Sequence, residues 1–161
     1  MGYIAFIEVH VTLLGEGHED AVDGTSMLAT AYWLESQWEE AEQFQTLVMG
    51  ARKTKLGEDL PHTLTSMTNL ASVYSSQGRW PEAEQLDLQV IGTRKTKLGE
   101  DHLDTLTSMV NFAFTWKSPG HDAEAINLLR DCLAKEKRIL RQHHPNTSSN
   151  SETLLEWEIE A

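Results

Sequence analysis

Apolar side chains recur along the middle of the chain with the spacing of an amphipathic helix. One set of apolar residues has members three or four positions apart, or side by side, and so shares one helix face. Its members are Leu64, Met67, Leu70, Ala71 and Tyr74. A half-buried strand would instead alternate apolar and polar residues at every second position. The pattern therefore predicts a helix over this stretch.

A second apolar stripe follows after a short break. Its members are Ala83, Leu86, Val90 and Ile91. Gly78 suits the left-handed conformation that commonly ends a helix, and Pro81 suits the first turn of a helix, where its missing N–H does no harm. The stretch from Leu64 to Ile91 thus predicts two helices joined by a tight turn.

The same pattern returns after 42 residues. Arg52–Asp59 repeats letter for letter at Arg94–Asp101, and the match continues from Thr63–Met67 to Thr105–Met109, which gives 13 identities in 16 positions. Further sets in register are Leu28, Leu70 and Phe112; Tyr32, Tyr74 and Trp116; Ala41, Ala83 and Ala125; and Val48, Val90 and Cys132. A fixed period of this length predicts an all-α solenoid of stacked antiparallel helix pairs.

The period also sets the expected repeat boundaries. Three repeats are predicted at 15–56, 57–98 and 99–140, with residues 1–14 as a degenerate or truncated helix of a preceding repeat. Residues 141–161 are predicted to form a partial fourth repeat or an acidic capping helix. The apolar residues of that last segment are Leu154, Leu155, Trp157 and Ile159.

The second unit resembles a tetratricopeptide repeat. The string that carries the resemblance is Asn69-Leu70-Ala71-x-x-Tyr74-x-x-Gln77-Gly78-Arg79-Trp80-x-Glu82-Ala83-Glu84. The 42-residue period and the loop around Leu56-Gly57-Glu58-Asp59 are similar to the kinesin-light-chain type, and the Thr-Leu-Thr-Ser-Met wording is similar to repeat arrays of fungal NLR-like signalling ATPases. The resemblance implies a right-handed superhelix whose concave groove receives peptide segments.

The resemblance also implies which side chains line such a groove, because the first helix of each repeat faces it. The expected peptide-binding residues are Thr65, Thr68, Asn69, Ser72, Thr107, Asn111, Phe114 and Lys117, with Ser76 and Val110 beside them and Ser26, Thr30 and Trp33 in the first repeat. In the family an asparagine at the position of Asn69 and Asn111 contacts the peptide backbone, since a carboxamide donates and accepts at once. The alternative is that both asparagines only bridge neighbouring helices.

Charge narrows the range of partners. The net charge is −12, but residues 52–149 hold 13 bases against 12 acids, so no basic excess favours nucleic acid. Lys117 is the only cation among the expected groove residues, which favours a mainly neutral protein or peptide partner. No apolar run is long enough to span a membrane.

Cysteine and histidine carry no evident chemistry. Cys132 is the single cysteine, so no internal disulfide can form, a cytoplasmic location is expected, and its place on an apolar stripe predicts a small core residue. His143 and His144 lack further ligands at suitable spacing, so no metal is expected. No Gly-rich phosphate loop is present, and no cofactor is expected.

These observations favour a non-enzymatic, protein- or peptide-binding repeat module that works as the recognition or scaffold part of a larger assembly. One alternative is a structural spacer that self-associates through its ends, where Tyr3, Phe6 and Trp157 supply large aromatic surfaces. Another is a fragment of a fungal NLR-like signalling receptor.

Overall fold

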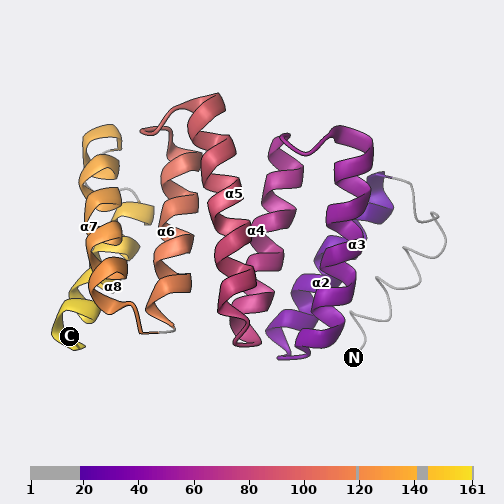
Figure 1. The fold of residues 1–161 in the computed structure, drawn as a ribbon, viewed down its shortest axis with the longest axis horizontal. Coiled ribbons are helices and arrows are strands. Elements are labelled where there is room, and N and C mark those ends of the chain that lie inside the picture. The colour runs from indigo at the N-terminus through magenta and orange to yellow at the C-terminus, as the bar shows by residue number, and fades with distance from the viewer. Residues whose placement is uncertain (1–18, 119, 141–144, 161) are drawn as a thin grey trace. The chain divides into compact units, whose positions relative to one another are not determined.

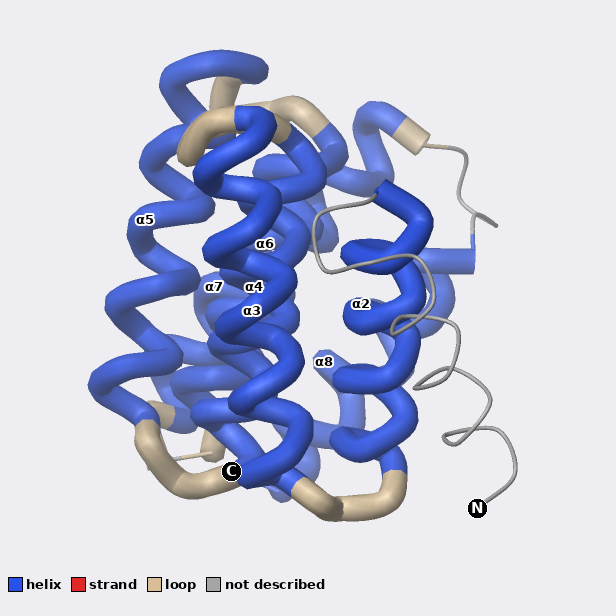
Figure 2. The backbone as a smooth tube through the Cα atoms, turned by 90° about the vertical axis from the view of Figure 1, so that its right-hand side faces the viewer, coloured by secondary structure: helices blue, strands red, loops and turns tan. Residues whose placement is uncertain are grey.

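The described part of the chain is helical throughout, apart from its connecting loops (Figures 1 and 2). A computed structural model describes residues 19–118, 120–140 and 145–160. Its helices are α2 (Glu19–Leu34), α3 (Trp38–Leu56), α4 (Pro61–Ser76), α5 (Trp80–Leu98), α6 (Leu103–Lys117), α7 (Asp122–Ile139) and α8 (Pro145–Glu160). The predicted preceding helix at residues 1–14 lies outside the described residues.

Glycines end several of these helices. Gly78 follows α4 with a φ of 75°, which confirms the predicted left-handed cap. Gly57 and Gly99, one period apart, follow α3 and α5 with φ values of 108° and 96°. These three turns therefore need a residue without a Cβ.

The chain divides into two compact units, residues 1–79 and 80–161. In the first unit α3 packs against both α2 and α4. In the second unit α6 packs against α5 and α7, and α7 also packs against α8. Short loops join consecutive helices within each unit, so these neighbours run antiparallel (Figure 1).

The positions that share the 42-residue period form the cores of the two units. In the first unit Leu28, Ala41, Val48 and Leu70 are each at most 2% exposed. The equivalents in the second unit that are at most 4% exposed are Ala83, Val90, Phe112, Ala125 and Cys132. The sequence prediction of these core positions is confirmed.

Two residues of the predicted stripes, Leu86 and Cys132, differ in how deeply they are buried. Leu86 was expected on the buried face of its helix but is only half-buried, and its neighbour Asp87 is buried instead, at 3% exposure. Cys132 is fully buried, as predicted, and burial raises the pKa of its thiol to about 12. A thiol in that state is not a nucleophile at neutral pH.

The last helix, α8, completes the core of the second unit. Leu154 and Trp157 are buried and belong to the same apolar cluster as Phe112 of α6 and Leu129 of α7. Trp157 was expected to supply an aromatic surface for self-association, and that prediction is wrong because this side chain is buried in the core. Tyr3 and Phe6 lie outside the described residues. Helix α8 spans Pro145–Glu160, within the final segment of 141–161 that the sequence predicts. Whether it counts as a partial fourth repeat or as a cap is a matter of repeat definition, and both descriptions stay predictions.

Candidate peptide-binding surface

A cleft of about 150 Å³ opens among the three helices of the first unit. Its lining comes from Ala29, Thr30 and Trp33 of α2, Gln45 of α3, and Asn69, Ser72 and Val73 of α4. The structure thus brings four of the expected groove residues, Thr30, Trp33, Asn69 and Ser72, to one place. They come from two helices that the repeat period places in equivalent positions, so the cleft lies where the sequence analysis expects a ligand.

Asn69 and Asn111 were expected either to contact a peptide or to bridge neighbouring helices. Both side chains are half-buried, on α4 and α6 respectively. Among the described residues, no hydrogen bond joins either side-chain amide to a neighbouring helix. A helix-bridging role for these asparagines would therefore rest on packing alone.

The hydroxyl groups on the same face donate to their own helices. Thr65 donates to the carbonyl oxygen of Pro61 at 2.9 Å, and Thr68 donates to that of Leu64 at 3.1 Å. Ser72 donates to the carbonyl oxygen of Thr68 at 3.2 Å. Thr107 of α6 repeats the contact, with 2.9 Å to the carbonyl oxygen of Leu103. These groups can still accept hydrogen bonds, because the oxygen lone pairs are not used up by donating.

Trp33 is held in place at the edge of the cleft. Its indole Nε1–H donates to Ser76 Oγ at 2.9 Å, across from α2 to α4. Ser76 in turn donates to the carbonyl oxygen of Ser72 at 3.0 Å. Since the indole N–H is used, Trp33 offers the cleft a largely apolar ring, which is 38% exposed.

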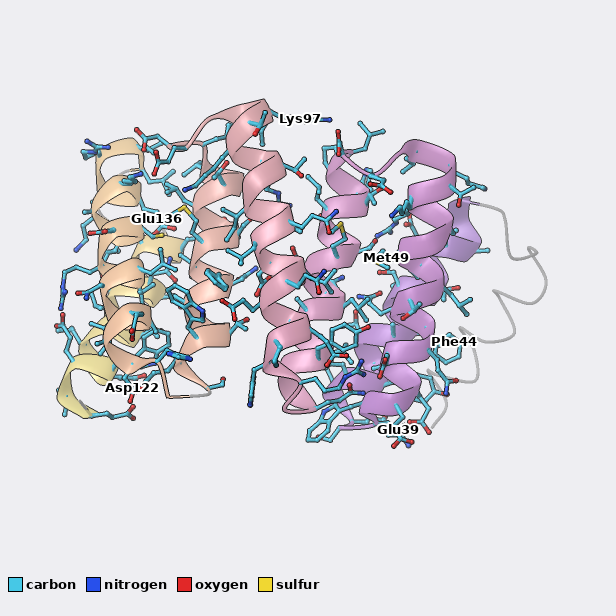
Figure 3. All side chains as sticks on the ribbon, in the orientation of Figure 1. Glu39, Phe44, Met49, Lys97, Asp122 and Glu136 are labelled. Carbon is cyan, nitrogen blue, oxygen red and sulfur yellow. The ribbon has the colours of Figure 1, made fainter. Side chains whose placement is uncertain are left out.

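In the second unit Phe114 and Lys117 lie against α8. The rings of Phe114 and Trp157 meet edge to face, with centroids 4.9 Å apart. Lys117 Nζ lies 3.0 Å from Asp122 Oδ1 and 3.5 Å from Glu160 Oε2. The hydrogen bond to Asp122 is the main reason that the pKa of Lys117 is raised. The one cation on the expected surface is therefore already neutralised within the chain; Figure 3 labels Asp122 at the start of α7.

The other nearby basic side chains are also engaged. Arg79 Nη1 lies 2.8 Å from Glu42 Oε1, and the Arg79 guanidinium stacks 4.1 Å from the centre of the Tyr74 ring. Lys53 pairs with Glu58, and its equivalent Lys95 lies 3.7 Å from Glu100. No charged side chain lines the cleft itself. Its chemistry suits an uncharged ligand group.

The structure differs from the sequence-based expectation at three positions, Val110, Gln45 and Asp87. Val110 was expected to face the groove, but it is only 6% exposed and belongs to the core of the second unit, so that prediction is wrong. Sequence reasoning missed Gln45 and its equivalent Asp87, which are 2% and 3% exposed. The signal was present as a polar residue at the same repeat position, within an otherwise apolar stripe.

Metal binding finds no support in the described ranges. No group of three His, Cys, Asp or Glu side chains there is arranged to hold a metal ion. The His143–His144 pair lies outside the described residues. Likewise, no helix within the described ranges is long and apolar enough to cross a membrane.

The helices and the period together define a class, the helical-repeat proteins built from stacked helix pairs. The sequence model of the tetratricopeptide repeat matches residues 63–104 and 105–146, which is just over half of the chain. The chain therefore belongs to the tetratricopeptide repeat (TPR) family. Its fold is an all-α solenoid, as predicted.

Solved structures agree with this family. The chain is similar to the nearly identical TPR-like repeats of a kinesin light chain-type protein from Podospora anserina, with 26% identity, 96% of this chain and 75% of that chain covered, and a TM-score of 0.75. BtubC from P. vanneervenii shares the fold at 17% identity, over 86% of this chain and 56% of that chain, with a TM-score of 0.70. The TPR domain of Arabidopsis OM64 does so at 15% identity, over 88% and 98%, with a TM-score of 0.56.

A search of curated proteins by sequence finds no match. The repeats are similar to those of the kinesin-light-chain type, and a TPR fold is consistent with a protein-interaction module. TPR repeats generally bind protein or peptide partners, and the family is generally non-enzymatic.

Proposed function

We propose that the chain is a non-enzymatic, cytoplasmic module that binds an extended, mainly uncharged peptide segment of a partner protein. In the first unit the contacts come from α4, and in the second unit they come from α6. The proposed binding residues are Thr65, Thr68, Asn69, Ser72, Thr107, Asn111, Phe114 and Lys117. In this role the chain is the recognition or scaffold part of a larger assembly.

One observation carries the proposal. Asn69 and Asn111 stand one period apart, and the amide of each is free of other helices in the described chain. A carboxamide of this kind matches a peptide backbone, whose N–H and C=O groups need an acceptor and a donor at regular intervals. The cleft beside Asn69 has no charged lining, which supports an uncharged segment.

Lys117 and Phe114 support a more limited role. Both already contact α8, so a peptide would meet the Lys117 ammonium group together with the carboxylates of Asp122 and Glu160. This arrangement lowers the attraction for an acidic or C-terminal carboxylate ligand. It therefore argues against a carboxylate-clamp type of TPR interaction.

The test is binding of a peptide library to the purified chain and to the Asn69→Ala and Asn111→Ala variants. We expect micromolar binding by the parent and about tenfold weaker binding by each variant, which corresponds to roughly 1.4 kcal/mol for one lost hydrogen-bonded pair. Gln43→Ala is the matched control, because Gln43 is an exposed carboxamide on α3 away from the cleft. If both asparagine variants bind like the parent while remaining folded, the proposed site is wrong.

Self-association is a second candidate function, supported by α8. Leu155 and Ile159 of this helix are 60% and 85% exposed and lie one helical turn apart. Exposed apolar pairs of this kind commonly mark a contact surface when they form part of a larger patch. We propose this as an alternative in which the repeats stack on a second copy.

A further inference from the structure

The cleft of the first unit contains a buried acceptor without a donor. Gln45 is 2% exposed and lines the cleft from α3. Its Oε1 makes no hydrogen bond within the described part of the chain. A buried polar atom in this state is unfavourable, and in native proteins such atoms are nearly always paired with a protein group, a water molecule or a ligand.

In the second unit the polar side chain at the equivalent position has a hydrogen-bond donor. Asp87 stands one period after Gln45, and Thr115 stands one period after Val73. Thr115 Oγ1 donates to Asp87 Oδ2 at 2.8 Å, from α6 to α5. In the first unit the residue facing Gln45 from α4 is Val73, which has the shape of threonine but no hydroxyl group. The donor that the repeat supplies internally in one unit is therefore lacking in the other.

The remaining walls of the cleft restrict what can supply that donor. Thr30 and Ser72 donate to carbonyl oxygens of their own helices, at 3.0 and 3.2 Å. The Trp33 indole N–H is used by Ser76. The cleft therefore offers a ligand the carboxamides of Gln45 and Asn69, which both donate and accept, and the hydroxyl oxygens of Thr30 and Ser72, which can only accept; the apolar side chains of Ala29 and Val73 lie around them.

Size and charge narrow the choice further. The cleft measures about 150 Å³, a volume that holds a benzene-sized group. Without an acidic side chain in the lining, a lysine or arginine would lose its hydration without gaining a counter-charge. A carboxylate can accept from the amides of Gln45 and Asn69, but it leaves Gln45 Oε1 without a donor. A serine hydroxyl could donate but would leave most of the volume unfilled.

We propose that this cleft is a specificity pocket for a primary carboxamide, the side chain of an asparagine or glutamine in the bound peptide. The ligand NH₂ donates to Gln45 Oε1, and the ligand carbonyl oxygen accepts from the Asn69 amide. The ligand methylene groups contact Ala29 and Val73. This inference rests on the proposed peptide-binding function and adds the identity of the side chain that is selected.

The direct test uses a defined probe on the full chain. N-acetyl-glutamine methylamide is titrated into ¹⁵N-labelled protein, and the Trp33 indole and Gln45 side-chain NH₂ signals are followed by NMR. We expect saturable shifts with this probe and an affinity at least tenfold weaker for the methionine and glutamate analogues, which have a similar length. Equal responses to the glutamine and methionine probes, or no saturable shift with any probe, would overturn the inference.

Two variants separate the pocket from a general effect on folding. Val73→Thr adds only a hydroxyl group, which we expect to donate to Gln45 as Thr115 does to Asp87. It should weaken glutamine-probe binding at least tenfold without lowering the melting temperature. Gln45→Met, which keeps the length of the side chain but removes its amide, should do the same to binding. Unchanged probe binding by both variants would overturn the inference.

The peptide library distinguishes this inference from the proposed function. We expect the parent to select peptides that contain asparagine or glutamine, and Val73→Thr to lose that preference. Selection that depends on Asn69 and Asn111 but shows no carboxamide preference would overturn the pocket while leaving peptide binding intact. Probe binding at Gln45 without selection of any peptide would support the pocket and contradict the peptide-binding function.

Discussion

At the scale of single residues, the surroundings of Asp87 have opposing effects on its pKa. It is 3% exposed, and its carboxylate accepts a hydrogen bond from the Thr115 hydroxyl. Burial raises the pKa of Asp87 from its ordinary value of 3.8 to about 6, and the hydrogen bond from Thr115 opposes that rise. Burial is the larger effect because one hydrogen bond from a neutral hydroxyl only partly replaces hydration.

This pKa predicts how stability varies with pH. Between pH 3.8 and about 6 the folded chain keeps the Asp87 proton more readily than the unfolded chain does. The Asp87 contribution to stability is therefore full below pH 4 and is lost as pH rises through 6, by up to roughly 3 kcal/mol. Asp87→Asn should remove this dependence, as measured by urea denaturation of parent and variant from pH 4 to pH 7.

The informative quantity is the difference between parent and variant, since other carboxyl groups titrate in both proteins. Asp131→Asn, at an exposed position of α7, serves as the control. A parent-minus-variant difference that stays constant over this pH range would contradict the prediction.

At the scale of helices and loops, the repeated string builds a junction between consecutive repeats. Arg94 Nη1 donates to Ser108 Oγ at 2.7 Å and to the carbonyl oxygen of Asp104 at 3.0 Å. Thr105 Oγ1 donates to the carbonyl oxygen of Gly99 at 2.9 Å. These contacts tie the end of α5 to the start of α6 across the loop. The identity of Arg94, Thr105 and Ser108 with their equivalents one period earlier is thus explained by the junction that they build.

The first unit makes the same junction. Arg52 Nη1 donates to Ser66 Oγ at 2.8 Å, and Thr63 Oγ1 donates to the carbonyl oxygen of Gly57 at 2.8 Å. Arg52 also reaches Asp23 of α2, with Nη2 2.7 Å from Oδ1. The neighbouring Lys53 instead pairs with Glu58 in the loop itself.

The junction predicts a specific loss of stability. Arg94→Met keeps the apolar stem of the side chain but removes both hydrogen bonds of the guanidinium group. We expect the free energy of unfolding to fall by about 2 kcal/mol, the typical contribution of hydrogen bonds from a charged donor at a partly buried site. Urea denaturation at neutral pH measures it.

Lys137→Met is the matched control, because Lys137 is an exposed cation near the end of α7. Its substitution should change the unfolding free energy by less than about 0.5 kcal/mol. Equal effects of the two substitutions would show that the junction contributes nothing beyond its charge.

At the scale of the whole molecule, stability depends on the packing of each helix against its neighbours. No helix pair of a solenoid can bury its apolar faces alone, so each pair needs the next one. In the second unit α8 takes this role for α7 through Leu154 and Trp157. A buried carboxylate adds a polar contact between the same helices, because Glu136 accepts from Asn150 Nδ2 at 2.9 and 3.1 Å (Glu136 is labelled in Figure 3).

The self-association alternative predicts a measurable change of mass with concentration. If the exposed residues of α8 join two copies, the average mass in sedimentation equilibrium should rise with protein concentration. The double variant Leu155→Glu, Ile159→Glu should then stay monomeric, because like charges at the contact oppose association. A parent that stays strictly monomeric at high concentration would rule out this alternative and leave the peptide-binding function.

Much of the fold could be read from residue spacing. The period located Leu28, Leu70 and Phe112, and likewise Val48 and Cys132, as core residues, and all of them are buried. Such predictions succeed because a helix of 3.6 residues per turn converts spacing into a face, and a repeat copies that face. Asn69 was singled out differently, by the resemblance to the tetratricopeptide repeat.

The cleft and the buried polar pairs were decided only by the tertiary structure. Gln45 and Asp87 occupy the same repeat position, yet the facing residue is Val73 in one case and Thr115 in the other. Whether such a polar group finds a donor depends on the distance and rotation between two helices, and local spacing along either helix contains neither quantity. Sequence periodicity therefore determined which faces are apolar, and helix packing determined which buried polar atoms are satisfied.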